Sequence, residues 1–296
     1  MTGPPEIFDR ELLARRRDRA ASTAWAHDFL LRRVADDIVE RLQIIRREFP
    51  AVLNLGAHHG LLGRSVRTLK SVGTVIDMER ARRLLALSEG PAVLADEEAL
   101  PFAPGSLDLV VSGLSLHLVN DLPGTLAQIR HALKPDGLLL AALLGGETLR
   151  ELREAWLAAE DEIAGGASPR VAPFADVRDL GGLLQRAGFA LPVVDSDVVT
   201  VNYASPLALM QDIKAMGASN MLVARRRTPV TRPLLARAGA IYSERFGGAG
   251  GRVPATFEIL TLTAWVPHES QQKPLKPGSA QARLADALGV KEEKLR

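Results

Sequence analysis

A short apolar run that ends in a glycine-bearing turn is the first place in this sequence where chemistry is expected. Residues 51–55 are apolar apart from Asn54, and the turn Gly56-Ala-His-His-Gly60 follows directly. A strand that ends in glycine turns tightly and brings a ligand against main-chain N–H groups, and a helix from about Leu61 would offer that ligand its positive end. Any strand-to-helix turn can use glycine, so the turn alone fits a purely structural role equally well.

Carboxylates close the next two strand-like runs. Asp77 ends the run 73–76, 21 residues after Gly56, the separation at which an acid binds ribose hydroxyls in nucleotide-binding α/β folds. Asp96 ends the run 92–95, where it would accept a hydrogen bond from an adenine amino group. Both acids also suit helix N-caps, which are common at strand ends. Three such features at three successive strand ends nevertheless predict a ligand site at the carboxyl edge of the sheet.

The elements that position these residues alternate between strand and helix. Apolar and β-branched runs predict seven strands, at 51–56, 73–76, 92–95, 107–112, 137–144, 193–201 and 256–266. Helical periodicity separates most of them, which predicts an α/β fold with a doubly wound sheet covered by helices on both faces.

The chain divides into three parts on the same patterns. Residues 1–50 read as an N-terminal helical segment and residues 51–266 as the main domain. Within that domain, 204–250 is a helical insert between the last two strands, placed to act as a lid at one end of the sheet. Residues 267–296 form a polar C-terminal tail.

Composition excludes several kinds of site and partner. There are no cysteines among the 296 residues, so disulfides, thiolate zinc sites and cysteine nucleophiles are ruled out. The net charge is only +2 and aromatic residues make up 4%, which argues against a nucleic-acid partner. No apolar run is long enough for a transmembrane segment. Acidic residues near the start, such as Glu6 and Asp9, argue against a leader peptide, so a cytoplasmic location is predicted.

An ordered set of motifs along the chain resembles that of a known protein family. After Leu53-x-Leu-Gly-Ala-x-x-Gly60 come Val75-Ile-Asp77, Ala95-Asp-Glu-Glu-Ala-Leu-Pro-Phe102, Ser106-Leu-Asp-Leu-Val-Val-Ser112 and His131-Ala-Leu-Lys-Pro-Asp-Gly-Leu138. The set resembles the class I S-adenosylmethionine-dependent methyltransferases, which have a Rossmann-like seven-stranded sheet. A dinucleotide-binding domain fits less well, because its G-x-G-x-x-G pattern needs a glycine within residues 57–59 that is not there.

A narrower resemblance extends over residues 7–290. It rests on the segments Ile7-Phe-Asp-Arg-Glu-Leu-Leu13, Arg17-Asp-Arg-Ala-Ala21, Gly113-Leu-Ser-Leu-His-Leu-Val-Asn-Asp121, Met216-Gly-Ala-Ser-Asn220 and Lys273-Pro-Leu-Lys-Pro-Gly278. Together these look like the mitochondrial complex I assembly factor methyltransferases and their bacterial relatives. The malonyl-carrier-protein methyltransferases of biotin synthesis resemble the first half better than the second.

The resemblance implies S-adenosylmethionine as cofactor and a set of residues along which it lies. These are Gly56, Ala57, His58, Gly60, Asp77, Met78, Asp96, Glu97, Ser112 and Leu114. One departure stands out, since relatives usually keep a second glycine near His58, where a ring now limits close approach to the backbone. We expect His58 and His59 to be exposed on the following helix, and we expect no metal site.

The reaction expected is methyl transfer to a protein or small-molecule acceptor. His117, just past the fourth predicted strand, is the best-placed general base, and a packing or capping role fits it equally well. The family resemblance also implies an alternative, hydroxylation of an arginine on a respiratory complex I subunit, for which the histidines supply no iron facial triad. A non-catalytic assembly factor and a malonyl-carrier-protein methyltransferase are the remaining alternatives.

Overall fold

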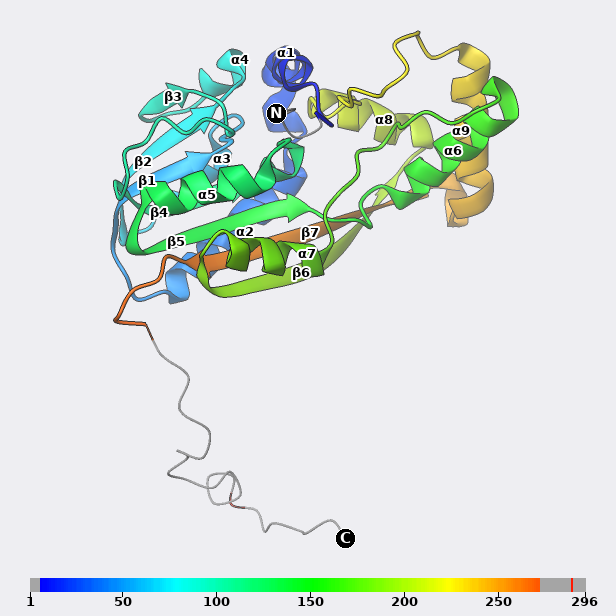
Figure 1. Cartoon of the computed structure of the whole chain (residues 1–296). Helices are drawn as coiled ribbons and strands as arrows, with labels where there is room; N and C mark the ends of the chain where they lie inside the picture. Colours follow the sequence, from blue (N-terminus) through cyan, green and yellow to red (C-terminus); the bar gives the residue numbers. More distant parts are fainter. Residues whose placement is uncertain (1–5, 272–288, 290–296) are drawn as a thin grey trace, which may run out of the picture.

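The computed structural model describes residues 6–271 and residue 289. Most of the predicted tail therefore lies outside the described residues. Seven strands form one sheet in the order β3-β2-β1-β4-β5-β7-β6 (Figure 1). Their bounds are β1 (Phe49–Leu55), β2 (Val72–Glu79), β3 (Ala92–Leu94), β4 (Leu107–Gly113), β5 (Leu133–Leu144), β6 (Ala190–Tyr203) and β7 (Val253–Trp265).

The sheet confirms the α/β class and every predicted strand, with one difference in direction. The first five strands run parallel, whereas β7 is antiparallel to both β5 and β6. Alternating strands and helices predict a sheet in which all strands are parallel. The segment after β6, however, brings the chain back beside β6 in the opposite direction, so β7 pairs with β6 in the antiparallel sense. The strand order reverses between β1 and β4, and α/β sheets bind ligands beyond the carboxyl ends of the strands at such a point.

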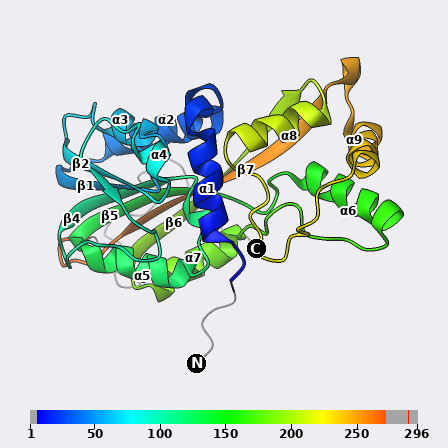
Figure 2. The same cartoon turned by 90° about the horizontal axis from the view of Figure 1, so that it is seen from above.

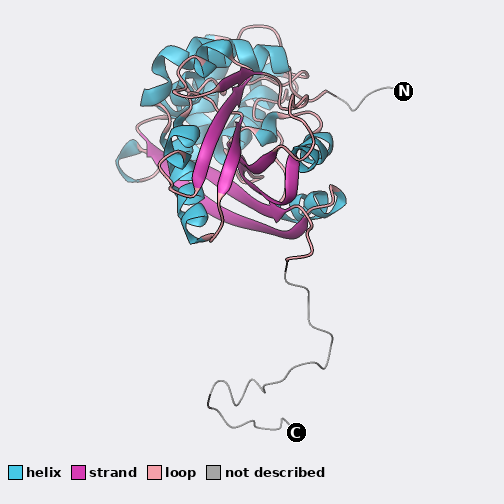
Figure 3. Cartoon of the chain, turned by 90° about the vertical axis from the view of Figure 1, so that its left-hand side faces the viewer, coloured by secondary structure: helices cyan, strands magenta, loops and turns pink. Residues whose placement is uncertain are grey.

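Helices cover both faces of this sheet (Figure 3). The longer ones are α1 (Arg10–Ala20), α2 (Phe29–Ile44), α5 (Leu122–Ala132), α6 (Arg150–Ala164), α7 (Val177–Arg186), α8 (Pro206–Ala215) and α9 (Arg232–Phe246). The shorter ones are η1 (Ala21–Ala26), α3 (Leu61–Val66), α4 (Arg82–Leu85), η2 (Leu116–Leu118) and η3 (Ala249–Gly251).

Alternation along the central strands assigns the two faces. Val52 of β1 and Leu109 of β4 belong to a core packed with α2 and α3, whereas Leu53 and Val110, one residue further along, belong to the core beneath α5 and α7. Because successive strand side chains point to opposite faces, a strand buried on both sides must be largely apolar. This is why the strands could be found as continuous apolar runs.

The N-terminal helix α1 lies across the carboxyl edge of the sheet, as the view from above shows (Figure 2). It begins after Asp9, whose side chain accepts the hydrogen bond of the Leu12 amide as an N-cap. Leu13 of α1 and Phe8 just before it pack in a small cluster with Leu118 and residues 221–222. The helix is thus held over the place where the sequence predicts the ligand.

The insert between β6 and β7 contains α8 and α9. Helix α9 packs on α6, away from the sheet edge, and contributes Leu234, Ala238 and Tyr242 to the larger core. Helix α8 lies nearer the sheet edge, and the turn that follows it approaches α1, where the Cα of Arg17 and an ideal Cβ on Gly217 would be 3.1 Å apart. The insert therefore meets the N-terminal helix.

Candidate functional site

The turn after β1 has the backbone that the sequence predicts for a ligand-binding loop. Gly56 and Gly60 have φ angles of +65° and +81°, which L side chains rarely adopt. A Cβ on Gly56 would lie 2.2 Å from the Cβ of Ser115, so no other residue fits there. The Ala57 amide donates to the Met78 carbonyl at 2.8 Å, which ties the turn to β2.

His58 departs from the expected surface position. Its φ of +51° is left-handed, so it keeps a glycine-like backbone at a cost in strain. Its amide donates to the Glu79 carboxylate at 3.0 Å, and its ring Nε2 lies 3.0 Å from the Gly113 carbonyl. Burial and the nearby Arg17 lower the pKa of His58 to about 3, so the ring is neutral and Nε2–H is the donor in that contact.

The expectation of an exposed surface is wrong for His59 as well. Its side chain is buried, its ring lies edge-on to Trp25, and its Nε2 lies 3.2 Å from the Asp28 carboxylate. Burial lowers its pKa, against the opposing effect of Asp28. His59 is thus built into the interior between the turn and α2, whereas the half-buried His58 is turned toward the end of β4.

The two acids at the end of β2 differ in what they face. Asp77 is fully buried and accepts hydrogen bonds from Asn54 at 2.7 Å and from Arg67 at 2.7 Å. Glu79 accepts bonds from the His58 amide and from Arg17 of α1, at 3.0 and 3.2 Å. The structure therefore directs Glu79 to the glycine turn and Asp77 toward α3. Sequence reasoning missed Glu79, although it follows Asp77 by two residues and so shares its face of β2.

Arg10 of α1 and Arg80, which follows β2, neutralise the acids that come after β3. Arg10 reaches both Asp96 and Glu97 at 2.5 Å, and Arg80 bonds the other oxygen of Asp96 at 2.6 Å. Burial opposes ionisation of Asp96, but the Glu98 amide and these arginines outweigh it and hold its pKa below the usual range. The Glu97 side chain also accepts a bond from the Ser115 hydroxyl at 2.8 Å. No motif in the sequence signalled that α1 supplies Arg10 as a partner of these acids.

The remaining predicted residues separate into two groups. Ser112 is buried and its hydroxyl donates to the Leu55 carbonyl at 2.8 Å, and Met78 is packed in the core beneath α5. Leu114 has a φ of +52° and lines a cavity together with His58 and His117. Of Ser112, Met78 and Leu114, only Leu114 therefore faces open space.

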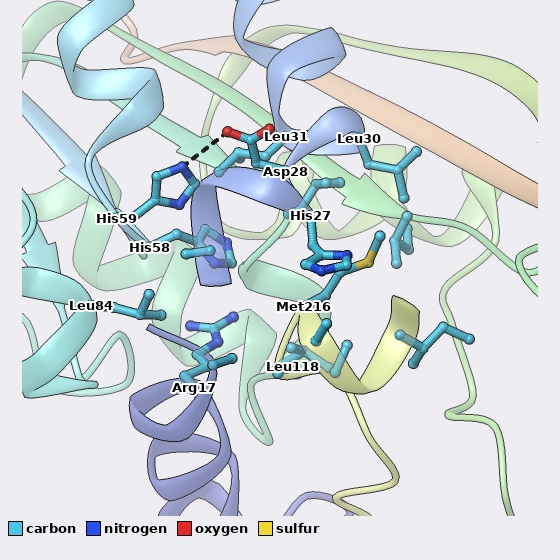
Figure 4. A pocket seen from close by; sticks show the side chains of 18 of the residues that line it. Arg17, His27, Asp28, Leu30, Leu31, His58, His59, Leu84, Leu118 and Met216 are labelled. Carbon is cyan, nitrogen blue, oxygen red and sulfur yellow. Dashed lines mark hydrogen bonds and ion pairs between the residues drawn. The ribbon is translucent and has the colours of Figure 1, made fainter. Parts of the chain in front are cut away.

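That cavity has a volume of about 150 Å³ and a largely apolar lining (Figure 4). Its walls come from α1, η1, the start of α2, the glycine turn, the segment after β4 and the end of α8. Arg17, His27, His58, His59 and His117 are the basic side chains on its walls, and Asp28 is the acidic one. The predicted turn and the insert thus meet at one cavity.

His117 is brought to this cavity, but in a form that weakens it as a base. Burial, with Arg17 and His58 nearby, lowers its pKa to about 3. Its Nδ1 faces the Leu144 amide at 3.5 Å, and its ring lies 5.7 Å from that of Phe174. A general base works best with a pKa near the working pH, so these surroundings favour a packing role.

Neither a metal cluster nor a membrane span is found in the described part of the chain. No group of three His, Cys, Asp or Glu side chains there could hold a metal ion. None of the described helices is long and apolar enough to cross a membrane.

Comparison with known proteins agrees with this geometry. The Methyltransferase domain family matches residues 53–141, which include the turn and the acids. A phosphoethanolamine N-methyltransferase 2 from Haemonchus contortus, solved with S-adenosyl-L-methionine, superposes with a TM-score of 0.51 at 14% identity, over 79% of this chain and 52% of that one. The fold and the matched domain are those of the class I methyltransferases that use S-adenosylmethionine.

Two groups of relatives extend over nearly the whole chain. The arginine-hydroxylase NDUFAF5 of Danio rerio is 41% identical, with 95% of this chain and 89% of that protein covered. A malonyl-[acyl-carrier protein] O-methyltransferase of Halorhodospira halophila is 36% identical, with 89% and 90% covered. The chain belongs to the family of the NDUFAF5 arginine hydroxylases and their bacterial methyltransferase relatives.

The predicted cytoplasmic location is contradicted by these relatives. NDUFAF5 of zebrafish, rat, mouse and human is named as a mitochondrial protein in each case. The acidic residues near the N-terminus were therefore no guide to the compartment in which these relatives work.

The residues present fit the cofactor in their chemistry. The glycines of the turn allow a ligand to approach the backbone closely, and carboxylates stand at the ends of β2 and β3, as a nucleoside requires. The hydroxyl of Ser88, buried beside Gly60, has no hydrogen-bond partner within the described residues. The cavity of about 150 Å³, however, is below the roughly 300–1,000 Å³ of typical ligand sites. Arg10 and Arg17 occupy the adjoining edge, where they pair with Glu97 and Glu79.

Proposed function

We propose that this chain methylates an arginine-bearing protein of respiratory complex I with S-adenosylmethionine. The observation that carries the proposal is the glycine turn after β1, with two left-handed glycines, opening beside an apolar cavity closed by the insert. The cofactor would then lie at the strand ends, and the acceptor would lie beside it under α8.

The cofactor would lie along the turn and the strand ends next to it. Gly56, Ala57 and Gly60 offer backbone approach, and we propose Glu79, in preference to Asp77, as the carboxylate for the ribose hydroxyls, because Glu79 already contacts the turn. Asp96 and Glu97 stand where the adenine would lie once Arg10 releases them. Leu114 would line the methionine end.

The acceptor is proposed from the relatives and from the cavity. The relatives at 41–42% identity are named arginine hydroxylases, which favours an arginine-bearing protein. An arginine side chain has a long apolar stem and a charged head. The apolar cavity walls suit the stem, and Asp28 is the acid on those walls for the head. We propose residues 204–250 as the lid over this acceptor.

The bound cofactor supplies an electrophilic methyl group on a sulfonium. This chain's own residues have to align donor and acceptor and exclude water, since the reaction is an in-line displacement. Leu13 and Leu118 on the walls exclude water, and the neutral rings of His58 and His117 add no positive charge beside the sulfonium.

Two other functions have specific support. The name of the NDUFAF5 relatives favours hydroxylation of the arginine, and the Halorhodospira relative favours the carboxyl group of a malonyl-carrier protein as acceptor. A non-catalytic factor that keeps the fold would bind the cofactor without turnover.

Mass spectrometry of complex I subunits from a strain lacking this chain tests the proposal. We expect one arginine to lose the mass of a methylene group compared with the parent strain. Loss of the mass of an oxygen atom would replace methylation by hydroxylation, and an unchanged set of subunits would contradict both. Purified chain with malonyl-[acyl-carrier protein] and labelled cofactor tests the second acceptor directly, through release of S-adenosylhomocysteine.

A further inference from the structure

A second histidine–carboxylate contact reaches the cavity from the insert. His27 follows η1 and lines the cavity, and its Nδ1 lies 2.5 Å from Oδ1 of Asp212 on α8. The hydroxyl of Tyr203, at the end of β6, donates to Oδ2 of the same carboxylate at 2.7 Å. Three residues separated by up to 185 positions in sequence thus form one chain of hydrogen bonds that ends at the cavity.

The contact with Asp212 determines which ring nitrogen of His27 carries the proton and which one can accept a proton. A carboxylate beside Nδ1 holds the proton on that nitrogen and leaves Nε2 as the basic atom. The Tyr203 bond occupies the second oxygen of Asp212, so the carboxylate cannot turn away from the ring. Figure 4 shows His27 on the cavity wall beside Met216, between the start of α2 and the end of α8.

The other histidines on the same wall are less suited to accept a proton. His58 donates its Nε2–H to the Gly113 carbonyl, and His59 has its Nε2 turned to Asp28. His117 has no carboxylate partner among the described residues, and its pKa is about 3. Among the histidines of the cavity, His27 is the one whose Nδ1 pairs with a carboxylate while its Nε2 stays open to a ligand.

We propose that His27 is a catalytic residue that takes the proton of the acceptor nitrogen, with Asp212 and Tyr203 as its positioning residues. The proposal rests on the proposed function. An arginine guanidinium stays protonated at neutral pH, so its methylation must release one N–H proton. As the nitrogen forms its bond to the methyl carbon and the carbon–sulfur bond breaks, that proton passes to Nε2. S-adenosylhomocysteine carries away the electron pair, and the imidazolium later releases the proton to water.

The position of Asp212 adds a consequence for the insert. Because α8 supplies the carboxylate and the segment after η1 supplies the ring, the base is assembled only when the insert and the N-terminal segment meet. Closure of the lid over an acceptor would therefore also orient the base. A malonyl carboxylate is already an anion and has no proton to lose, so His27 would not matter for that acceptor.

The test compares His27→Asn with the unaltered chain, with complex I from a strain lacking this chain as acceptor and labelled S-adenosylmethionine as donor. The asparagine amide can still donate to Asp212, but it cannot accept a proton. We expect kcat to fall about a hundredfold while KM, the Kd for the cofactor and Tm stay unchanged. Asp212→Asn should lower kcat less, and Tyr203→Phe less again.

His131→Asn is the matched control, because His131 is exposed on α5 and outside the cavity. If His27→Asn retains the kcat of the unaltered chain, the proposal is wrong. A fall in Tm with an unchanged kcat would also overturn it, since the contact would then only join the insert to the N-terminal segment. If the unaltered chain transfers no methyl group although it binds the cofactor, the proposed function itself fails.

Discussion

The guanidinium of Arg17 lies 3.2 Å from the carboxylate of Glu79, so a helix that precedes the sheet in sequence closes the end of β2. Both side chains are almost fully buried. A buried ion pair is costly to break from one side only, because the remaining charge is left without a partner in a medium of low polarity. The pair thus ties the position of α1 to the site beneath it.

Removal of one partner should therefore destabilise the chain more than removal of both. We expect Arg17→Ala to lower the free energy of unfolding by about 3 kcal/mol, and Arg17→Ala with Glu79→Gln to recover at least half of that loss. Urea unfolding followed by circular dichroism measures both. Arg19→Ala, at an exposed position of the same helix, is the control and should change little. Equal losses in the single and double variants would show that the pair contributes little.

The two acids of β2 should differ in their effect on cofactor binding. We expect Glu79→Gln to weaken S-adenosylmethionine binding about tenfold or more, since it removes the carboxylate that faces the glycine turn. Asp77→Asn should leave the Kd within about twofold but lower stability, because Asp77 bonds Asn54 and Arg67 in the interior. Isothermal titration calorimetry with the folded variants decides between them. The reverse order of effects would restore Asp77 as the ribose ligand.

The choice between Asp77 and Glu79 shows how much of the site can be predicted from the sequence alone. Nearly continuous apolar runs located the central strands, which are buried on both faces, whereas β-branched residues located the largely exposed β6. Asp77 and Glu79 share one face of β2, so periodicity cannot separate them, and only the neighbouring helices decide which one is turned to the site. The contacts of Arg17 with Glu79 and of His27 with Asp212 link segments 62 and 185 positions apart, which no local pattern encodes.

The half-buried, neutral histidines of the cavity should make stability depend on pH. His58 and His117 have pKa values of about 3 in the folded chain, against about 6.5 when unfolded. Between these values the unfolded chain binds more protons, so stability rises with pH, is complete above about pH 6.5, and is lost as the pH falls toward 3. Each histidine contributes a slope of up to ~1.4 kcal/mol per pH unit in that window.

Urea unfolding between about pH 5 and pH 8 measures this slope, in a range where most carboxylates stay ionised. The double variant His58→Asn with His117→Asn should show a shallower rise than the unaltered chain. His131→Asn, on the surface of α5, should keep the original slope. Parallel curves for all three proteins would mean that the two rings titrate alike in the folded and unfolded chain.

The left-handed backbone of His58 leads to a prediction about cofactor affinity. His58→Gly removes a strained non-glycine residue at φ +51°, a gain of about 1–3 kcal/mol, and loses the ring contact with the Gly113 carbonyl, a loss of about 1 kcal/mol. Stability should therefore stay equal or rise slightly. Without the ring and its Cβ, a ligand can approach the turn more closely, so we expect S-adenosylmethionine to bind several times more tightly. His58→Ala separates the two causes, because it removes the ring and keeps the strained Cβ. Calorimetry should then give affinities in the order glycine, alanine, histidine, and an unchanged Kd in the glycine variant would show that the ring does not limit approach to the turn.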